Sequence, residues 1–198
     1  MAEVVSDIII SPAKVYYGPV GETPPADSVA ADTAWGGNWV YCGFTKTPLS
    51  MKYEYDEYEI EVEQSFVPVD RIKQSETLTL ETVLAELSLT NLSLATGGTV
   101  TPTAAGVGQV GKEELVVGGV STLTKRAWGF EGKYVDEDGA TFPIRLFIWK
   151  GTGSMGGALE FGKKDYAGIS LSIKGLADRS KALGQQLFKM QKVLEPAT

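Results

Sequence analysis

The sequence predicts a mainly β protein, a β-sandwich or barrel-like sheet with one α-helix against its side. Apolar and polar residues alternate along several short runs, which is typical of strands with one buried face. Pro and Gly separate these runs, and a single Leu-rich stretch ends in a helix stop signal. At 198 residues, 43% of them hydrophobic, the chain is expected to form one domain with a substantial core.

The first segment, residues 1–38, is expected to be an N-terminal arm or long loop. It contains the stretch VYYGPVGETPPADSVAAD, whose prolines do not fit a central strand. Its aromatic side chains favour contact with a surface over disorder. We therefore expect this arm to cover another part of the assembled protein.

The β core is expected over residues 39–178. In KYEYDEYEIEVEQ, residues 52–64, the apolar positions change from odd to even at Asp56-Glu57, which predicts a bulge, a bend or a tight turn. DEDG, residues 136–139, predicts a hairpin turn. The small residues of 99–114 predict a loop, and 151–157 a flexible break. The strand patterns lie at 39–47, 49–55, 58–63, 74–83, 115–120, 125–135, 141–150 and 165–174.

The helix is expected near residues 82–96, in the stretch ETVLAELSLTNLSLATGG. Thr82 is a candidate cap, and Gly97-Gly98 is a C-terminal stop. The C-terminal segment, residues 179–198, fits two structures. Its apolar residues are spaced for a helix, whereas the alternation from Phe188 to Leu194 is typical of a strand, and periodicity alone leaves both open.

The negative charge is concentrated in one part of the chain. The net charge is −7, and residues 51–86 carry ten acidic and three basic residues, so this segment accounts for all of it. Such a balance argues against a general affinity for nucleic acid, which needs Lys and Arg. A solvated sheet face is the plain interpretation. A cation site, a contact with a basic partner and a surface that repels polyanions are the functional ones.

No catalytic, metal or cofactor site is expected. The chain has no His, and Cys42 is its only cysteine, which suggests folding in a reducing cytoplasm. Paired carboxylates among Glu59, Glu61 and Glu63 could serve a glycoside hydrolase, but no cleft is evident. DEDG lacks the rest of a calcium loop, and GVGQVG, residues 106–111, lacks the Lys of a phosphate loop. We also expect no signal peptide and no membrane binding.

The order of features resembles a known family. A Pro- and Gly-rich aromatic arm leads into strands, then into the acidic stretch EIEVEQSFVPVDRIKQSETLTLETVLAEL and the helix LTNLSLATGG, and near the end stands YAGISLSIKGLAD. Over residues 15–190 this resembles the tail tube protein, or major tail protein, of long non-contractile-tailed bacteriophages. Contractile-tail and type VI secretion tube proteins share that fold.

The resemblance implies a structural virion protein that is not an enzyme. Such proteins form hexameric rings that stack into a hollow tube, with arms and a hairpin loop bridging rings. Tape-measure, tail terminator and distal tail proteins are the implied partners, and assembly is implied in the host bacterial cytoplasm. DNA would pass through without specific binding, because an acidic lumen repels phosphates. The alternative is a carbohydrate-binding or adhesin-like β-sandwich whose sugar site is lined by Trp35, Trp39, Trp128 and Trp149.

Three sets of residues are candidates for these roles. Acidic residues expected to line the lumen are Glu57, Glu59, Glu61 and Glu63, with a ring-to-ring contact as the competing placement. Residues of the arm expected to contact the next ring are Val15, Tyr16, Tyr17, Pro19, Pro24 and Pro25. Basic C-terminal residues expected to meet an acidic ring are Lys181, Lys189 and Lys192.

Overall fold

The structure is a computed structural model that describes residues 11–136, 138–163 and 166–195. Within these ranges it confirms a mainly β, sandwich-like fold with one short helix. The helix is α1, Leu89–Thr96. The strands are β1 (Lys14–Gly18), β2 (Val40–Tyr41), β3 (Ser50–Ile60), β4 (Asp70–Leu84), β5 (Thr99–Thr103), β6 (Lys112–Val116), β7 (Lys125–Val135), β8 (Thr141–Met155), β9 (Ile169–Gly175) and β10 (Phe188–Lys192).

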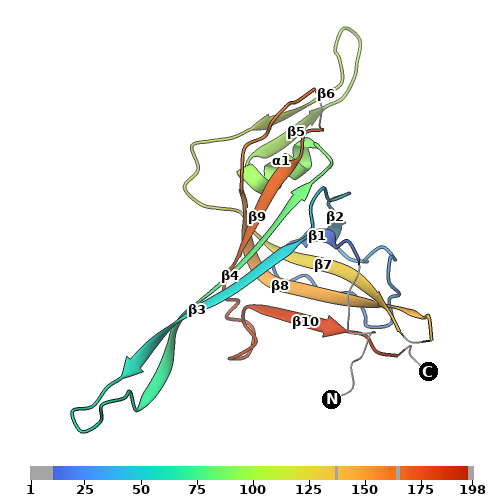
Figure 1. Ribbon diagram of the computed structural model, residues 1–198. Helices are drawn as coiled ribbons and strands as arrows, with labels where there is room; N and C mark the ends of the chain where they lie inside the picture. Colours follow the sequence, from blue (N-terminus) through green and yellow to red (C-terminus); the bar gives the residue numbers. More distant parts are fainter. Residues whose placement is uncertain (1–10, 137, 164–165, 196–198) are drawn as a thin grey trace.

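One antiparallel sheet forms the body, in the order β2-β1-β7-β8-β9-β4-β3 (Figure 1). Strand β8 is long enough to pair with β7 on one side and with two strands on the other. It pairs with β10 over residues 144–148 and with β9 over residues 151–155. The strands β5 and β6 make a separate two-stranded sheet.

The sheet is packed on both faces. Because side chains alternate along a strand, Val15 enters the larger core cluster and its neighbour Tyr16 the smaller one. The larger cluster gathers side chains of β1, β4, β7, β8, β9 and α1, with Trp128 fully buried at its centre. The smaller cluster holds Trp35 and Trp39, so the loop 19–39 covers that face. Two packed faces produce the sandwich-like architecture.

The helix begins later than the sequence pattern predicts. Residues 82–84 continue strand β4 and pair with 169–171 of β9, so Thr82 is not a helix cap. Ser88 caps α1 instead, and its hydroxyl accepts a hydrogen bond from the backbone N–H of Asn91 at 3.0 Å. Sheet pairing with β9 therefore overrides the leucine spacing. The predicted end is confirmed: Gly97 adopts a left-handed conformation, φ 72°, and closes the helix.

Several other boundaries were predicted wrongly. Strand β1 lies inside the expected arm, and residues 99–116, expected to begin as a loop, form the hairpin of β5 and β6. Strand β8 continues to Met155 through the expected break, where a Cβ on Gly153 would lie 2.4 Å from the carbonyl oxygen of Leu94. That glycine permits helix packing and does not mark flexibility. In the C-terminal segment, for which the sequence left a helix and a strand open, the structure forms a strand, β10.

Candidate functional site

Strands β3 and β4 form a long hairpin that extends away from the body (Figure 1). All residues from 50 to 59 and from 70 to 77 are exposed, whereas Leu78, Leu80 and Leu84 near the base are buried. Strand β4 pairs with β9 only from Thr79 to Leu84. The body therefore anchors the base of the long hairpin and leaves its outer part in solvent.

A β-bulge lies midway along the long hairpin, where the sequence predicts it. Asp56 pairs with Ser75, and Glu57 pairs with Lys73, so Gln74 is the extra residue on β4. A bulge bends the strand and increases its twist. Because the extra residue is on β4, alternation along β3 is not interrupted. The aromatic side chains of Tyr53 and Tyr55 therefore lie on one face of β3, and that of Tyr58 lies on the other.

The expected lumen residues Glu57 and Glu59 lie on the outer half of β3 and face cations of β4. The Arg71 guanidinium lies 2.8 Å from a carboxylate oxygen of Glu59 and 3.8 Å from one of Glu57. Farther in, Lys73 donates to the Tyr53 hydroxyl at 2.9 Å and pairs with Glu76 at 3.0 Å. These contacts, the hydrogen bond to Tyr53 first, raise the pKa of Lys73 to about 12. The face is therefore mixed in charge, not purely acidic as the sequence suggests.

The turn of the long hairpin carries the other two acids, Glu61 and Glu63, both exposed. Here the backbone N–H of Val69 donates to the carbonyl of Ile60 at 2.8 Å, and the Ser65 hydroxyl donates to the carbonyl of Val67 at 2.7 Å. The turn is thus ordered by its own hydrogen bonds. The structure brings all four predicted acids onto one projecting element.

The hairpin tip, residues 58–72, is also strongly apolar. Phe66 is fully exposed, and Tyr58 and Ile72, which pair across the strands, are 61% and 52% exposed. Val67 and Val69 add to this surface. Exposed apolar surface of this extent marks an interaction site more often than a free surface.

The arm candidates divide between the core and a loop. Val15 and Tyr16 are buried in β1, so the prediction that their side chains contact a neighbouring ring is wrong. Tyr17 is half-buried against Trp128 and beneath Arg126. Sequence reasoning missed strand β1 because Pro19 and the Gly-rich loop follow it directly. Pro19 is exposed in the loop 19–39, where Pro24 and Pro25 are half-buried.

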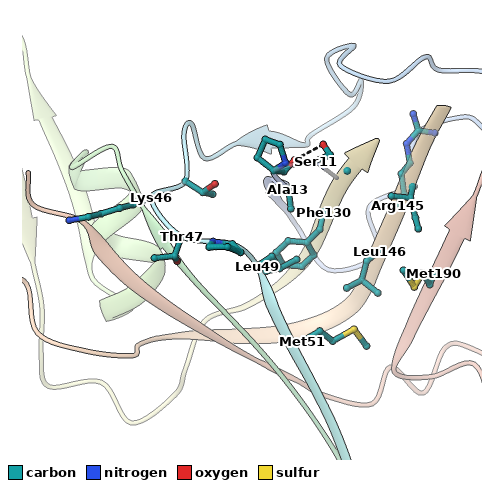
Figure 2. A pocket seen from close by; sticks show the side chains of 15 residues that line it. Ser11, Ala13, Lys46, Thr47, Leu49, Met51, Phe130, Arg145, Leu146 and Met190 are labelled. Carbon is teal, nitrogen blue, oxygen red and sulfur yellow. Dashed lines mark hydrogen bonds between the residues drawn. The ribbon is translucent and has the colours of Figure 1, made fainter. Parts of the chain in front are cut away.

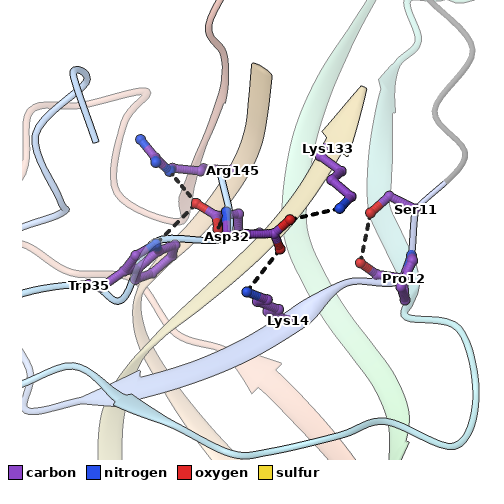
Figure 3. A network of polar contacts seen from close by, with 8 residues as sticks. Ser11, Pro12, Lys14, Asp32, Trp35, Lys133 and Arg145 are labelled. Carbon is purple, nitrogen blue, oxygen red and sulfur yellow. Dashed lines mark hydrogen bonds and ion pairs between the residues drawn. The ribbon is translucent and has the colours of Figure 1, made fainter. Parts of the chain in front are cut away.

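A buried ion pair, which the sequence analysis did not find, fastens this loop to the sheet (Figure 3). Arg145 of β8 and Glu131 of β7 meet at 2.8 Å, and both are almost fully buried. The Glu131 carboxylate also accepts from the Trp35 indole N–H at 3.1 Å, and Arg145 donates to loop carbonyls. Asp32 joins the cluster through its backbone N–H, which donates to the Glu131 carboxylate at 3.2 Å. Its own carboxylate pairs with Lys133 and Lys14, whose hydrogen bonds lower its pKa. Both charges of the pair are satisfied, as a buried ion pair requires.

The C-terminal candidates lie along β10 and the loop before it. The ammonium of Lys181 lies 4.4 Å from the centre of the Trp149 ring, and that of Lys192 lies 4.2 Å from the Tyr134 ring. Lys189 is exposed on β10. The three lysines give this edge of the molecule a positive charge, and residues 179–195 together carry a net charge of +3.

An apolar groove of about 680 Å³ opens between the base of the long hairpin and β10 (Figure 2). We call this surface the groove. Its lining includes Leu49, Met51, Phe130, Leu146 and Met190. Phe130 and Leu146 are buried at the floor, whereas Met51 and Met190 are 39% and 57% exposed. The groove thus offers apolar surface to a side chain from outside.

Comparison with protein families decides what kind of protein carries these surfaces. The family model described as Phage tail tube protein matches residues 3–193. The chain belongs to this family. A comparison with curated proteins gave no match.

Membership makes this tail tube protein a structural component of a virion tail and points away from enzymatic activity. The described residues include no group of three or more cysteine or acidic side chains placed to hold a metal ion. In the same residues, no helix combines the length and the apolar character that crossing a membrane requires.

The tryptophans of this tail tube protein do not form an exposed platform. Trp35, Trp39 and Trp128 are buried, and Trp149 is half-buried with Lys181 above its ring. A sugar cannot stack on a buried ring. The structure therefore gives no support to the carbohydrate-binding alternative.

Proposed function

We propose that the chain forms hexameric rings that stack into a hollow bacteriophage tail tube, through which the genome leaves the capsid. The observation that carries this proposal is the long hairpin. Within the described residues the outer edge of β3 pairs with no strand, and the apolar side chains of the hairpin tip are exposed. Unpaired edges invite pairing with another chain, and a ring of copies would cover them.

The acids of the long hairpin support an electronegative conduit. On β3, Glu57 and Glu59 lie on the face opposite to Tyr58 and Ile60, because successive side chains alternate. One face can therefore contact a neighbouring copy while the other faces the lumen. Residues 57–73 carry a net charge of −3 in spite of Arg71 and Lys73. Such a wall would repel DNA phosphates.

The remaining candidates stay part of the proposal. Exposed Pro19 in the loop 19–39 and Lys189 on β10 are our candidates for contacts between rings. Tape-measure, tail terminator and distal tail proteins are the proposed further partners, and assembly is proposed to take place in the host bacterial cytoplasm. Family membership and the surfaces described above support these assignments.

A charge reversal in the hairpin turn tests the conduit. Glu61 and Glu63 form no ion pair within the described residues, so Glu61→Lys with Glu63→Lys breaks no ion pair. In phage that carry both changes, we expect tails of normal appearance and infectivity lowered on the order of 10-fold, because phosphates are attracted to the wall.

The matched control is Glu113→Lys with Glu160→Lys, an equal change of charge at exposed positions outside the long hairpin. We expect this control to leave infectivity unchanged. Normal infectivity of the hairpin variant, with normal tails, would remove Glu61 and Glu63 from the lumen. An equal loss in both variants would show that overall charge, not position, matters.

A further inference from the structure

We propose that the apolar segment at the start of the chain, residues 4–10, docks into the groove of its own subunit and covers it. The segment, VVSDIII, precedes the described residues, and Asp7 is its one charged side chain. The groove has an apolar lining that is open to solvent and includes Met51 and Met190. The contact lies within one subunit, so it does not depend on the formation of a tube.

The described part of the chain begins at the groove. Ser11, Pro12 and Ala13 belong to its lining, and strand β1 starts at the next residue, Lys14 (Figure 2). Residues 4–10 are therefore joined directly to the wall of the groove. Such a short tether gives the segment an effective concentration on the order of millimolar. This proximity favours the segment over a second copy as the occupant.

The composition and the length of the segment fit an apolar groove. Five of its seven residues are Val or Ile, and burial of each such side chain is favourable. β-branched residues are also typical of an extended backbone on a half-buried surface. Seven extended residues span about 23 Å at roughly 3.3 Å per residue, whereas packed sheets lie only about 10 Å apart. The segment is therefore long enough to cross the groove.

The strands beside the groove can hold an extended segment through their backbones. Met51 belongs to β3, and Met190 belongs to β10. Within the described residues, β3 pairs only with β4 and β10 only with β8, so each strand has one unpaired edge. A segment that adds to such an edge gains main-chain hydrogen bonds as well as apolar contacts.

Docking protects the subunit before it meets any partner. An open apolar groove promotes association with other proteins. A short run of Val and Ile with little charge is an aggregation-prone sequence when it is exposed. When the segment fills the groove, these two apolar surfaces cover each other.

Disulfide trapping within the full-length chain tests the docking. Ile8→Cys and Ile9→Cys are each combined with Met190→Cys, because adjacent side chains of an extended segment point in opposite directions. Each double variant is oxidised mildly with diamide at low protein concentration. The native Cys42 does not compete, because it is buried and burial raises the pKa of its thiol to about 12. We expect one of the two double variants to form an intramolecular disulfide rapidly.

The matched control places the second cysteine at Lys189. This residue is exposed on β10, next to Met190, and is not part of the groove lining. A segment that is not docked would reach both positions at similar rates. A docked segment should react roughly 10-fold faster with Met190→Cys than with Lys189→Cys, because docking raises the effective concentration of only one pair of thiols. Met51→Cys in the lining and Lys52→Cys beside it repeat the comparison on β3.

Three results would overturn the docking. Equal rates inside and outside the groove lining, on both β10 and β3, would show that the segment is not held there. The absence of any intramolecular disulfide would lead to the same conclusion. Fast formation of disulfide-linked dimers in place of intramolecular disulfides would show that the segment enters the groove of a second copy. Circular dichroism verifies the fold of each variant, and the comparison on one strand replaces that on the other if a variant is unfolded.

Discussion

At the scale of single residues, the ion pair of Glu131 and Arg145 shows that charged side chains can be part of the buried interior. Both occupy strand positions that the sequence pattern predicts to face solvent, because charged side chains are seldom fully buried. The structure buries them under the loop 19–39, where the Trp35 indole and loop carbonyls supply the remaining hydrogen bonds. Neither partner carries a local sequence signal, because the residues that complete the pair lie about 100 positions away.

Arg145→Met should be strongly destabilising. The change leaves the Glu131 carboxylate buried without its cation, and we expect a loss of about 3–5 kcal/mol in the free energy of unfolding. Chemical denaturation followed by tryptophan fluorescence would measure it. The double variant Glu131→Gln with Arg145→Met removes both charges and should lose less. Equal losses in the single and double variants would contradict the idea that the unpaired charge is the cause.

At the scale of elements, the sequence predicted best where one periodicity governs a whole strand. Strand β7 occupies the predicted residues 125–135, and the phase change at Asp56-Glu57 marks a bulge. The sequence-based prediction failed where pairing between strands distant in sequence decides which structure a segment adopts. The helix start at Ser88 depends on residues 82–84 pairing with β9, and β1 depends on pairing with β7, both distant in sequence.

The candidate site was predicted only in part, for the same reason. Alternating acids placed Glu57 and Glu59 on one strand, but their pairing with Arg71 depends on the register across the long hairpin. The groove could not be predicted at all. It joins Leu49, Phe130 and Met190, which come from three separate parts of the chain.

Deletion of Gln74 should separate folding from assembly. It removes the extra residue of the bulge while the pairs on either side remain, so the outer half of the long hairpin is re-aimed. The base, held by β9, is untouched. We expect circular dichroism and the thermal midpoint to stay close to those of the native protein, while rings and filaments are lost. Unchanged assembly would show that the direction of the hairpin tip is unimportant.

At the scale of the whole molecule, two projections lie at opposite ends of the body (Figure 1). One is the long hairpin, and the other is the hairpin of β5 and β6, whose connection exposes Val107 and Val110. A subunit with distinct surfaces at its two ends is suited to head-to-tail contacts, which generate closed rings or open filaments. Such a geometry is consistent with the phage tail tube family, to which the chain belongs.

The central claim, assembly into hexameric rings and tubes, is tested most directly by negative-stain electron microscopy of the purified protein at high concentration. We predict rings with a central hole and sixfold symmetry, or hollow filaments built from them. If the protein alone remains monomeric, the measurement is repeated with tail-tip components that could initiate assembly. A chain that remains monomeric beside those components would contradict the account.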